Sequence, residues 1–399
     1  MFLAGCDKSA KTPANTLPPD EMFSGAIVLG SPSLTSGIPG TGPLALADVQ
    51  QWLANPQNHE ALKVALPLGL RSAEPLEIPA ENALTRAKIE LGRQLFFDRR
   101  LSHAGALSCA DCHNPVRHFT SDEIAHHSLR ETASAFNRIL SAEQFWDGRA
   151  KSLEDQIRFP LENEHEMHTT RAECIARISQ IEGYRLQFEA VFGKVDFESL
   201  CAALAAFQRS TVTGPSAWDY AMELQRLENF TLPRSAEDER SLAQVRTAAK
   251  AHPVSDAARR GGALFFSARA DCSRCHSGPN FTDEQYHDVG LRARTDRNSP
   301  VEKKVAADLG RFAVTGDEAD RYAFKTPTLR NVARTWPYFH DGRYHRLSEA
   351  VAHFVRGGDA EQSDITPLDL TPVETDDLVA FLEALTGELP QVATDRLPP

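Results

Sequence analysis

Apolar residues recur at helical spacing in several stretches of the chain. Between 87 and 97 the apolar positions Ile89, Leu91, Leu95 and Phe96 follow the period of an amphipathic helix. The same period predicts helices over residues 44–59, 152–158, 171–178, 197–207 and 378–385. No run of strictly alternating residues indicates strands. The pattern therefore predicts an all-α fold with little β structure.

The pattern divides the chain into two similar units. A Gly and a pair of Phe residues precede a Cys pair near residue 109 and again near residue 272, and a Phe-Thr pair follows each. Such self-similarity indicates an internal duplication. A polar, charged stretch over 237–255 separates the copies. We therefore expect a leader and flexible tether over 1–43, a first domain over 44–250 and a second over 251–399.

The N-terminal stretch has the features of an export signal. Small residues lead up to Cys6, as at the end of a bacterial lipoprotein signal, and a polar stretch rich in Pro, Ser and Gly follows. Only five residues precede Cys6, fewer than a working signal needs. We interpret them as a truncated lipoprotein leader with a lipid anchor at Cys6, and the alternative is a disordered tail.

Composition and charge narrow the partners. The 399 residues include 43 basic and 55 acidic ones, a net charge of −12, which repels nucleic acid and attracts basic protein surfaces. No apolar stretch is long enough to span a bilayer. We therefore expect a soluble protein with no nucleic-acid partner.

Two Cys-x-x-Cys-His motifs carry the chemistry. They are Cys109, Cys112 and His113, and Cys272, Cys275 and His276. Two thiols one helical turn apart can bond both vinyl groups of a haem, and the adjacent imidazole can ligate its iron. A zinc site and a thioredoxin-like redox pair are the alternatives. The His after both pairs favours two covalent c-type haems, whose attachment places the protein in the periplasm.

Two further cysteines, Cys174 and Cys201, lie on apolar helical faces. A free Cys in such a position usually behaves as a small buried apolar residue. We expect both to pack in a core rather than form a disulfide.

Several motifs in the same order resemble the bacterial di-haem cytochrome c peroxidase and MauG family. They are Cys109–His113, Gln144–Arg149, Glu166-Met167, Cys272–His276, Asp308–Arg311, Lys325–Asn331 and Pro337–Gly342. The resemblance spans about residues 79–387. It implies two cytochrome c-like helical domains, with a peroxidatic haem in the first and an electron-transfer haem in the second.

The resemblance also assigns roles to single residues. His113 matches the proximal ligand of the peroxidatic haem, and Trp146 matches the aromatic bridge between the two irons. Gln156, Pro160 and Glu166 match the distal pocket, where cleavage of peroxide needs a group that moves a proton between its two oxygens. Glu166 is the acid–base candidate.

A calcium ion between the domains is implied as well. The matching positions are Glu131, Thr335 and Pro337, with Glu131 where relatives typically have Asn. A carboxylate is an equally suitable ligand for calcium.

The sequence departs from the family at the sixth ligand of the second haem. The matching position is Phe354, which cannot bind iron, and no Met follows Met222. The candidates are His353 and Tyr344, together with His345, or else a five-coordinate iron. In the first domain His126 and His127 are candidates for a ligand that blocks the resting peroxidatic iron.

Three functions remain. The leading one is a periplasmic peroxidase that reduces hydrogen peroxide with electrons from a small c-type cytochrome or cupredoxin. The alternative is a MauG-type oxidase of aromatic side chains on a partner protein, and the third is a plain electron-transfer cytochrome. The resemblance also allows a homodimer.

Overall fold

The computed structural model of the chain describes residues 26–71, 76, 78–121, 130–229, 234–292, 294–295, 304–305 and 308–399. Its helices up to the middle of the chain are α1 (Pro32–Thr35), α2 (Leu46–Ala54), α3 (Arg86–Phe97), α4 (Cys109–Cys112), α5 (Leu153–Glu162), α6 (Arg171–Gln180), α7 (Glu182–Phe192) and α8 (Phe197–Ser210). They are followed by α9 (Ala217–Glu228), α10 (Ala236–Ala251), α11 (Asp256–Phe265), α12 (Phe312–Thr315), α13 (Leu347–Val355) and α14 (Pro372–Glu383).

Strands are short and few among the described residues. Parallel β1 (Ile27–Val28) and β2 (Val64–Ala65) form one pair. Antiparallel pairs join β3 (Tyr286–His287) to β6 (Phe324–Lys325) and β4 (Arg294–Thr295) to β5 (Lys304–Val305). The mainly helical fold that the periodicity predicts is confirmed. None of the helices in the described ranges combines the length and apolarity needed to cross a bilayer.

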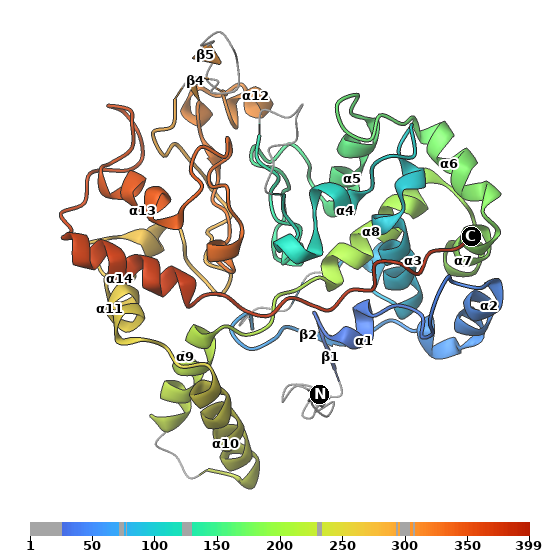
Figure 1. The fold of residues 1–399 in the computed structure, drawn as a ribbon, viewed down its shortest axis with the longest axis horizontal. Coiled ribbons are helices and arrows are strands. Elements are labelled where there is room, and N and C mark those ends of the chain that lie inside the picture. Colours follow the sequence, from blue (N-terminus) through green and yellow to red (C-terminus); the bar gives the residue numbers. More distant parts are fainter. Residues whose placement is uncertain are drawn as a thin grey trace, which may run out of the picture.

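Two apolar cores organise the molecule, one in each half of Figure 1. In the first, α3 packs against α8, where the carbonyl of Ala203 approaches so closely that only glycine fits at position 92. In the second, α11 packs against α14, and Gly261 makes the same kind of approach to Asp377. Helices α3 and α11 each precede a Cys pair along the chain. Each core therefore positions one Cys-x-x-Cys-His motif.

Along the chain, the boundary between the first and the second core lies before residue 250. Val212 belongs to the first core, while Trp218 and Ala221 of α9 already belong to the second. The polar stretch over 237–255 is mostly helix α10, which packs against α9 and projects from the body in Figure 1. The only buried residue of α10 is Leu242, and its charged residues face solvent. The polar composition of this stretch therefore reflects an exposed helix and not a linker.

Both ends of the described chain add to the first half. Within the predicted tether, residues 26–43 are packed: Leu29 and Leu34 are buried in the first core, and β1 pairs with β2. Cys6 lies outside the described residues. After α14 the chain crosses back to the first half and ends near α7 (Figure 1). There the buried Arg93 donates hydrogen bonds to the carbonyls of Ala393 and Arg396.

Candidate active site

The first Cys-x-x-Cys-His motif lies on a short capped helix. Ser108 and Asp111 cap α4 reciprocally, which fixes the turn that carries Cys109 and Cys112. His113 follows, and its Nδ1 lies 3.1 Å from the carbonyl oxygen of Phe119. Because a carbonyl only accepts, Nδ1 carries the proton and Nε2 keeps its lone pair for a metal. Burial lowers the pKa of His113, which favours the neutral ring that ligation requires.

The second motif repeats this arrangement. His276 Nδ1 lies 3.0 Å from the carbonyl oxygen of Phe281, and burial likewise lowers the pKa of His276. Phe119 and Phe281 both have left-handed backbone conformations, with φ of 53° and 51°. A non-glycine residue adopts this conformation at a cost, so its presence in both copies indicates that the turn has a function. Here the turn aims the carbonyl at the imidazole.

None of the described cysteines forms a disulfide. Cys174 and Cys201 are fully buried in the first core, so the prediction of core packing is confirmed. Cys109, Cys112, Cys272 and Cys275 are partly exposed, each pair beside its own histidine.

A cavity of about 260 Å³ opens at His113. Helix α5 contributes Gln156 and Pro160 to its wall, and the turn after α5 contributes Glu166. The Asn163 amide donates to Glu166 Oε1 at 2.7 Å, which leaves Oε2 for other partners. The structure thus brings the three predicted distal residues together in the cavity that contains the predicted iron ligand.

A second cavity of about 240 Å³ opens at His276. Trp146 lines both cavities, as do Lys325 and Tyr338. The indole Nε1–H of Trp146 donates to the carbonyl of Glu131 at 3.0 Å, and its backbone carbonyl accepts from the amide of Lys325 at 2.8 Å. Trp146 is therefore fixed between the two candidate haem sites.

The loop that carries Trp146 is clamped by charges from both halves. Arg130 forms ion pairs with Asp147 of this loop and with Asp308 of the second half. Arg311 donates to the carbonyls of Asp147 and Gly148. These contacts hold the tryptophan loop against the second half of the molecule.

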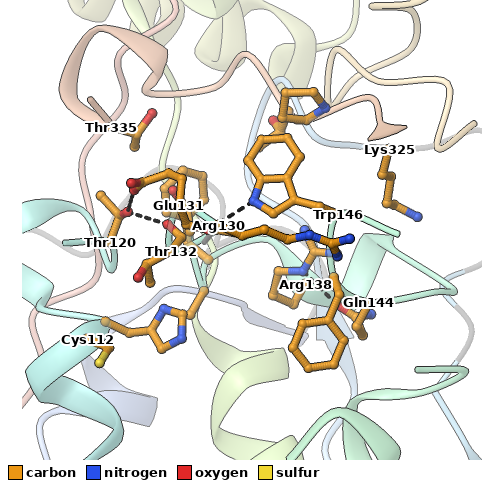
Figure 2. A pocket seen from close by; sticks show the side chains of 18 of the residues that line it. Cys112, Thr120, Arg130, Glu131, Thr132, Arg138, Gln144, Trp146, Lys325 and Thr335 are labelled. Atoms are coloured by element: carbon orange, nitrogen blue, oxygen red, sulfur yellow. Dashed lines mark hydrogen bonds between the residues drawn. The ribbon is translucent and has the colours of Figure 1, made fainter. Parts of the chain in front are cut away.

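Glu131, Thr335 and Pro337 line the first cavity together. Figure 2 shows the Glu131 carboxylate near the hydroxyl of Thr120, which donates to Oε1 at 3.2 Å. The other oxygen, Oε2, is buried and has no hydrogen-bond partner. Burial without a counter-charge raises the pKa of Glu131 to about 8. An orphaned carboxylate oxygen beside hydroxyl and carbonyl groups fits a hard cation.

The candidates for a sixth ligand of the second haem have different positions. Phe354 lines the second cavity, whereas His353 and Tyr344 do not. His353 Nε2 donates to the carbonyl of Val289 at 2.7 Å, and its Nδ1 accepts from Arg356 at 3.0 Å. With both nitrogens engaged, the structure does not place His353 as a ligand. His126 and His127 lie outside the described residues.

Two cations beside the cavities, the half-buried Arg138 and the buried Lys325, escaped the sequence analysis. Arg138 donates to Gln144 at 2.8 Å, and Lys325 pairs with Glu284 at 2.6 Å (Figure 2 labels Arg138, Gln144 and Lys325). Desolvation lowers the pKa of both cations. Lys325 begins one of the motifs that carry the family resemblance, but a lysine is usually exposed, so nothing in the pattern indicated a buried amine between two sites.

Comparison with known proteins agrees with this geometry. Residues 86–226 match the family described as di-haem cytochrome c peroxidase. The chain is 34% identical to the methylamine utilization protein MauG of Methylorubrum extorquens, over 84% of this chain and 88% of the relative. It is 33% identical to the cytochrome c551 peroxidase of Pseudomonas aeruginosa, over 77% and 81% of the two chains.

Solved structures agree as well. The crystal structure of a MauG-like protein associated with microbial copper homeostasis superposes with a TM-score of 0.65 at 28% identity. The match covers 79% of this chain and 93% of that one. The sequence similarity, the shared fold and the paired motifs around one tryptophan show that the chain belongs to the di-haem cytochrome c peroxidase and MauG family.

Proposed function

We propose that the protein is a periplasmic di-haem peroxidase that reduces hydrogen peroxide to water, with one c-type haem attached covalently in each half. The observation that carries this proposal is the convergence of Gln156, Pro160 and Glu166 on the cavity of His113, with Trp146 shared by the next cavity. A haem bound through His113 supplies the open iron and the redox chemistry that split the O–O bond. The protein's own side chains carry out the proton transfer.

Glu166 moves the proton. Asn163 holds Oε1, so Oε2 takes a proton from one peroxide oxygen and delivers it to the other, the one that leaves as water. The complete reaction joins one peroxide, two protons and two electrons into two water molecules. Arg138, half-buried at the same cavity, would supply positive charge for anionic groups of a bound haem.

A haem held by His276 would supply the entry point for electrons, and Trp146 lies between this cavity and the first one. The acidic surface, with a net charge of −12, attracts a small basic electron carrier such as a c-type cytochrome, and a cupredoxin is the other donor class. Glu131, Thr335 and Pro337 would hold a calcium ion, which would stabilise the segment whose carbonyl accepts the Trp146 hydrogen bond.

A second candidate is a MauG-type oxidase that withdraws electrons from aromatic side chains of a partner protein. Similarity to MauG and the absence of any Met after Met222, which excludes the usual thioether ligand from the second half, favour it. The two candidates share the peroxide site and differ in the direction in which electrons cross the protein surface.

The test compares Glu166→Gln with Glu164→Gln, an exposed neighbour outside the cavity. General acid–base catalysis contributes about 10²–10⁴-fold, so the rate of peroxide cleavage falls by about that factor in E166Q and stays unchanged in E164Q. Stopped-flow absorbance of the haem-loaded protein measures this rate. A full rate in E166Q would contradict the role of Glu166, and a protein without covalent haem would contradict the function.

Reduced cytochrome c separates the two candidates. Steady oxidation of this donor by peroxide supports the peroxidase. Peroxide-dependent loss of Trp or Tyr from a protein substrate, without oxidation of the donor, supports the MauG-type activity. The optical and electron paramagnetic resonance (EPR) spectra before reduction show which state of the enzyme reacts with peroxide.

A further inference from the structure

The two halves contain a structural repeat that relates the walls of the two cavities. Gln144 bridges Ala150 in the first half, and Tyr338 bridges Tyr344 in the second. Asn137 and Asn331 share a left-handed backbone, with φ of 56° and 57°. Gln144 and Tyr338, Ala150 and Tyr344, and Asn137 and Asn331 are all separated by the same number of residues along the chain. Helices α5 and α13 begin at equivalent positions of this repeat.

The repeat pairs the two distal residues on α5 with two residues of the second cavity. Gln156 corresponds to Ala350 and Pro160 to Phe354, and both second-half residues line the cavity at His276. Helix α13 therefore faces the second candidate haem as α5 faces the first. In the second cavity the polar side chain of this wall is replaced by a methyl group.

The face that α13 presents to the second cavity contains no ligating atom. It consists of Leu347, Ala350, Val351, Phe354 and Val355, spaced as one stripe of a helix. The Phe354 ring packs on Phe339, with ring centroids 5.7 Å apart. This contact fixes the Phe354 ring in the wall of the second cavity.

Several polar residues that line this cavity elsewhere have other partners. Tyr338 donates to the carbonyl of Val332 at 3.1 Å, and Lys325 pairs with Glu284. His287 Nε2 lies 2.7 Å from Asp283, and the His340 ring stacks on Phe324 at 3.6 Å. The wall formed by α13 itself offers no side-chain nitrogen, oxygen or sulfur to the cavity at His276.

We propose that the second haem keeps an open sixth position, walled by α13, that binds small uncharged ligands such as carbon monoxide, nitric oxide or dioxygen. The proposal rests on the proposed function, because it requires a haem at His276. An apolar wall without hydrogen-bond donors admits neutral diatomic molecules and stabilises no charged ligand. The protein then has two irons that bind external ligands, one beside the acid–base group Glu166 and one without it.

The test introduces a ligand at the open position. Phe354→Met places a thioether on the wall, and Phe354→Leu keeps the wall apolar. Ferric wild-type protein and F354L show a high-spin EPR signal from the second haem, and F354M converts one haem to low spin. Ferrous F354L binds as much carbon monoxide as wild type, while F354M binds it more weakly because the gas must displace the thioether.

The opposite outcome is equally clear. A low-spin second haem in wild type, F354M and F354L alike, with the same weak carbon monoxide binding in all three, would show that the iron already has a ligand, and the proposal would fail. A new high-spin haem in His353→Ala would show that His353 is this ligand. The pyridine haemochrome spectrum counts the haems in each variant, and stopped-flow mixing with peroxide tests the first site. A wild-type protein without two haems, or one whose first site does not react with peroxide, would refute the proposed function instead.

Discussion

The indole of Trp146 donates its hydrogen bond to the backbone carbonyl of Glu131, and the amide of Glu131 donates in turn to the carbonyl of His340. His340 occupies the position in the second half that Trp146 occupies in the first. A single residue, whose carboxylate is a calcium candidate, thus joins the equivalent positions of the two halves. A change at Glu131 therefore acts on both loops.

The first prediction concerns electron transfer through Trp146. Trp146→Phe leaves haem attachment and peroxide cleavage intact but slows oxidation of the electron donor, because phenylalanine is harder to oxidise and donates no hydrogen bond. The unpaired carbonyl of Glu131 costs about 1–3 kcal/mol of unfolding free energy. Trp336→Phe is the control, since Trp336 lines neither cavity. Equal donor oxidation in both variants would exclude a relay.

A second prediction concerns calcium. Added calcium stabilises the wild-type protein by about 2.7 kcal/mol at a hundred times the dissociation constant, and a chelator reverses the effect. Glu131→Gln removes the buried charge that holds the ion, so calcium shifts its thermal midpoint little. The matched variant Glu164→Gln responds as wild type does. A chelator without effect on the wild-type midpoint would argue against the site.

The third prediction concerns pH. Burial lowers the pKa of His340 to about 4, against about 6.5 in an unfolded chain. Between these values the unfolded state binds the proton that the folded state rejects, so stability falls as the pH falls from 6.5 to 4, by about 3 kcal/mol in total. His340→Phe keeps the stacking on Phe324 and removes this part of the acid sensitivity. Denaturant unfolding across this range measures the difference, with His252→Phe, on the surface, as control.

The fourth prediction concerns a buried ion pair of the second half, whose arginine also contacts the first half. Arg330 pairs with Asp219 at 2.7 Å and also donates to the carbonyl of Gly69. Asp219→Asn leaves the buried guanidinium without a counter-charge and costs about 3–5 kcal/mol of unfolding free energy. Asp219 also completes the capping box of α9 with Ser216, and Asp238 does the same with Ser235 on the exposed helix α10. Asp238→Asn therefore loses at most the cap, about 0.5–2 kcal/mol. Equal losses would show that capping alone matters at Asp219.

Much of the site was predictable because its chemistry is local in sequence. Two thiols and an imidazole within five residues form a haem-binding motif wherever they fold, and Trp146 was identified by its motif. The family order also grouped Gln156, Pro160 and Glu166, which line one cavity in the structure, while their catalytic roles stay a prediction. These side chains lie on short segments of the chain, so their positions in the sequence were sufficient to group them.

Other features depend on contacts between distant segments. The core of the second half begins at α9, but polarity alone could not separate a projecting helix such as α10 from a linker. The hydrogen bonds of His353 to Val289 and Arg356 decide its role, and no spacing rule indicates them. The buried state of Lys325 likewise depends on Glu284, which lies in a loop about forty residues earlier.

The return of the chain after α14 has a consequence for folding. Buried Arg93 pairs with Glu90 and also donates to the carbonyls of Ala393 and Arg396, so residues beyond α14 complete its hydrogen bonds. The first core therefore gains its full set of polar contacts only when the segment after α14 has docked on it.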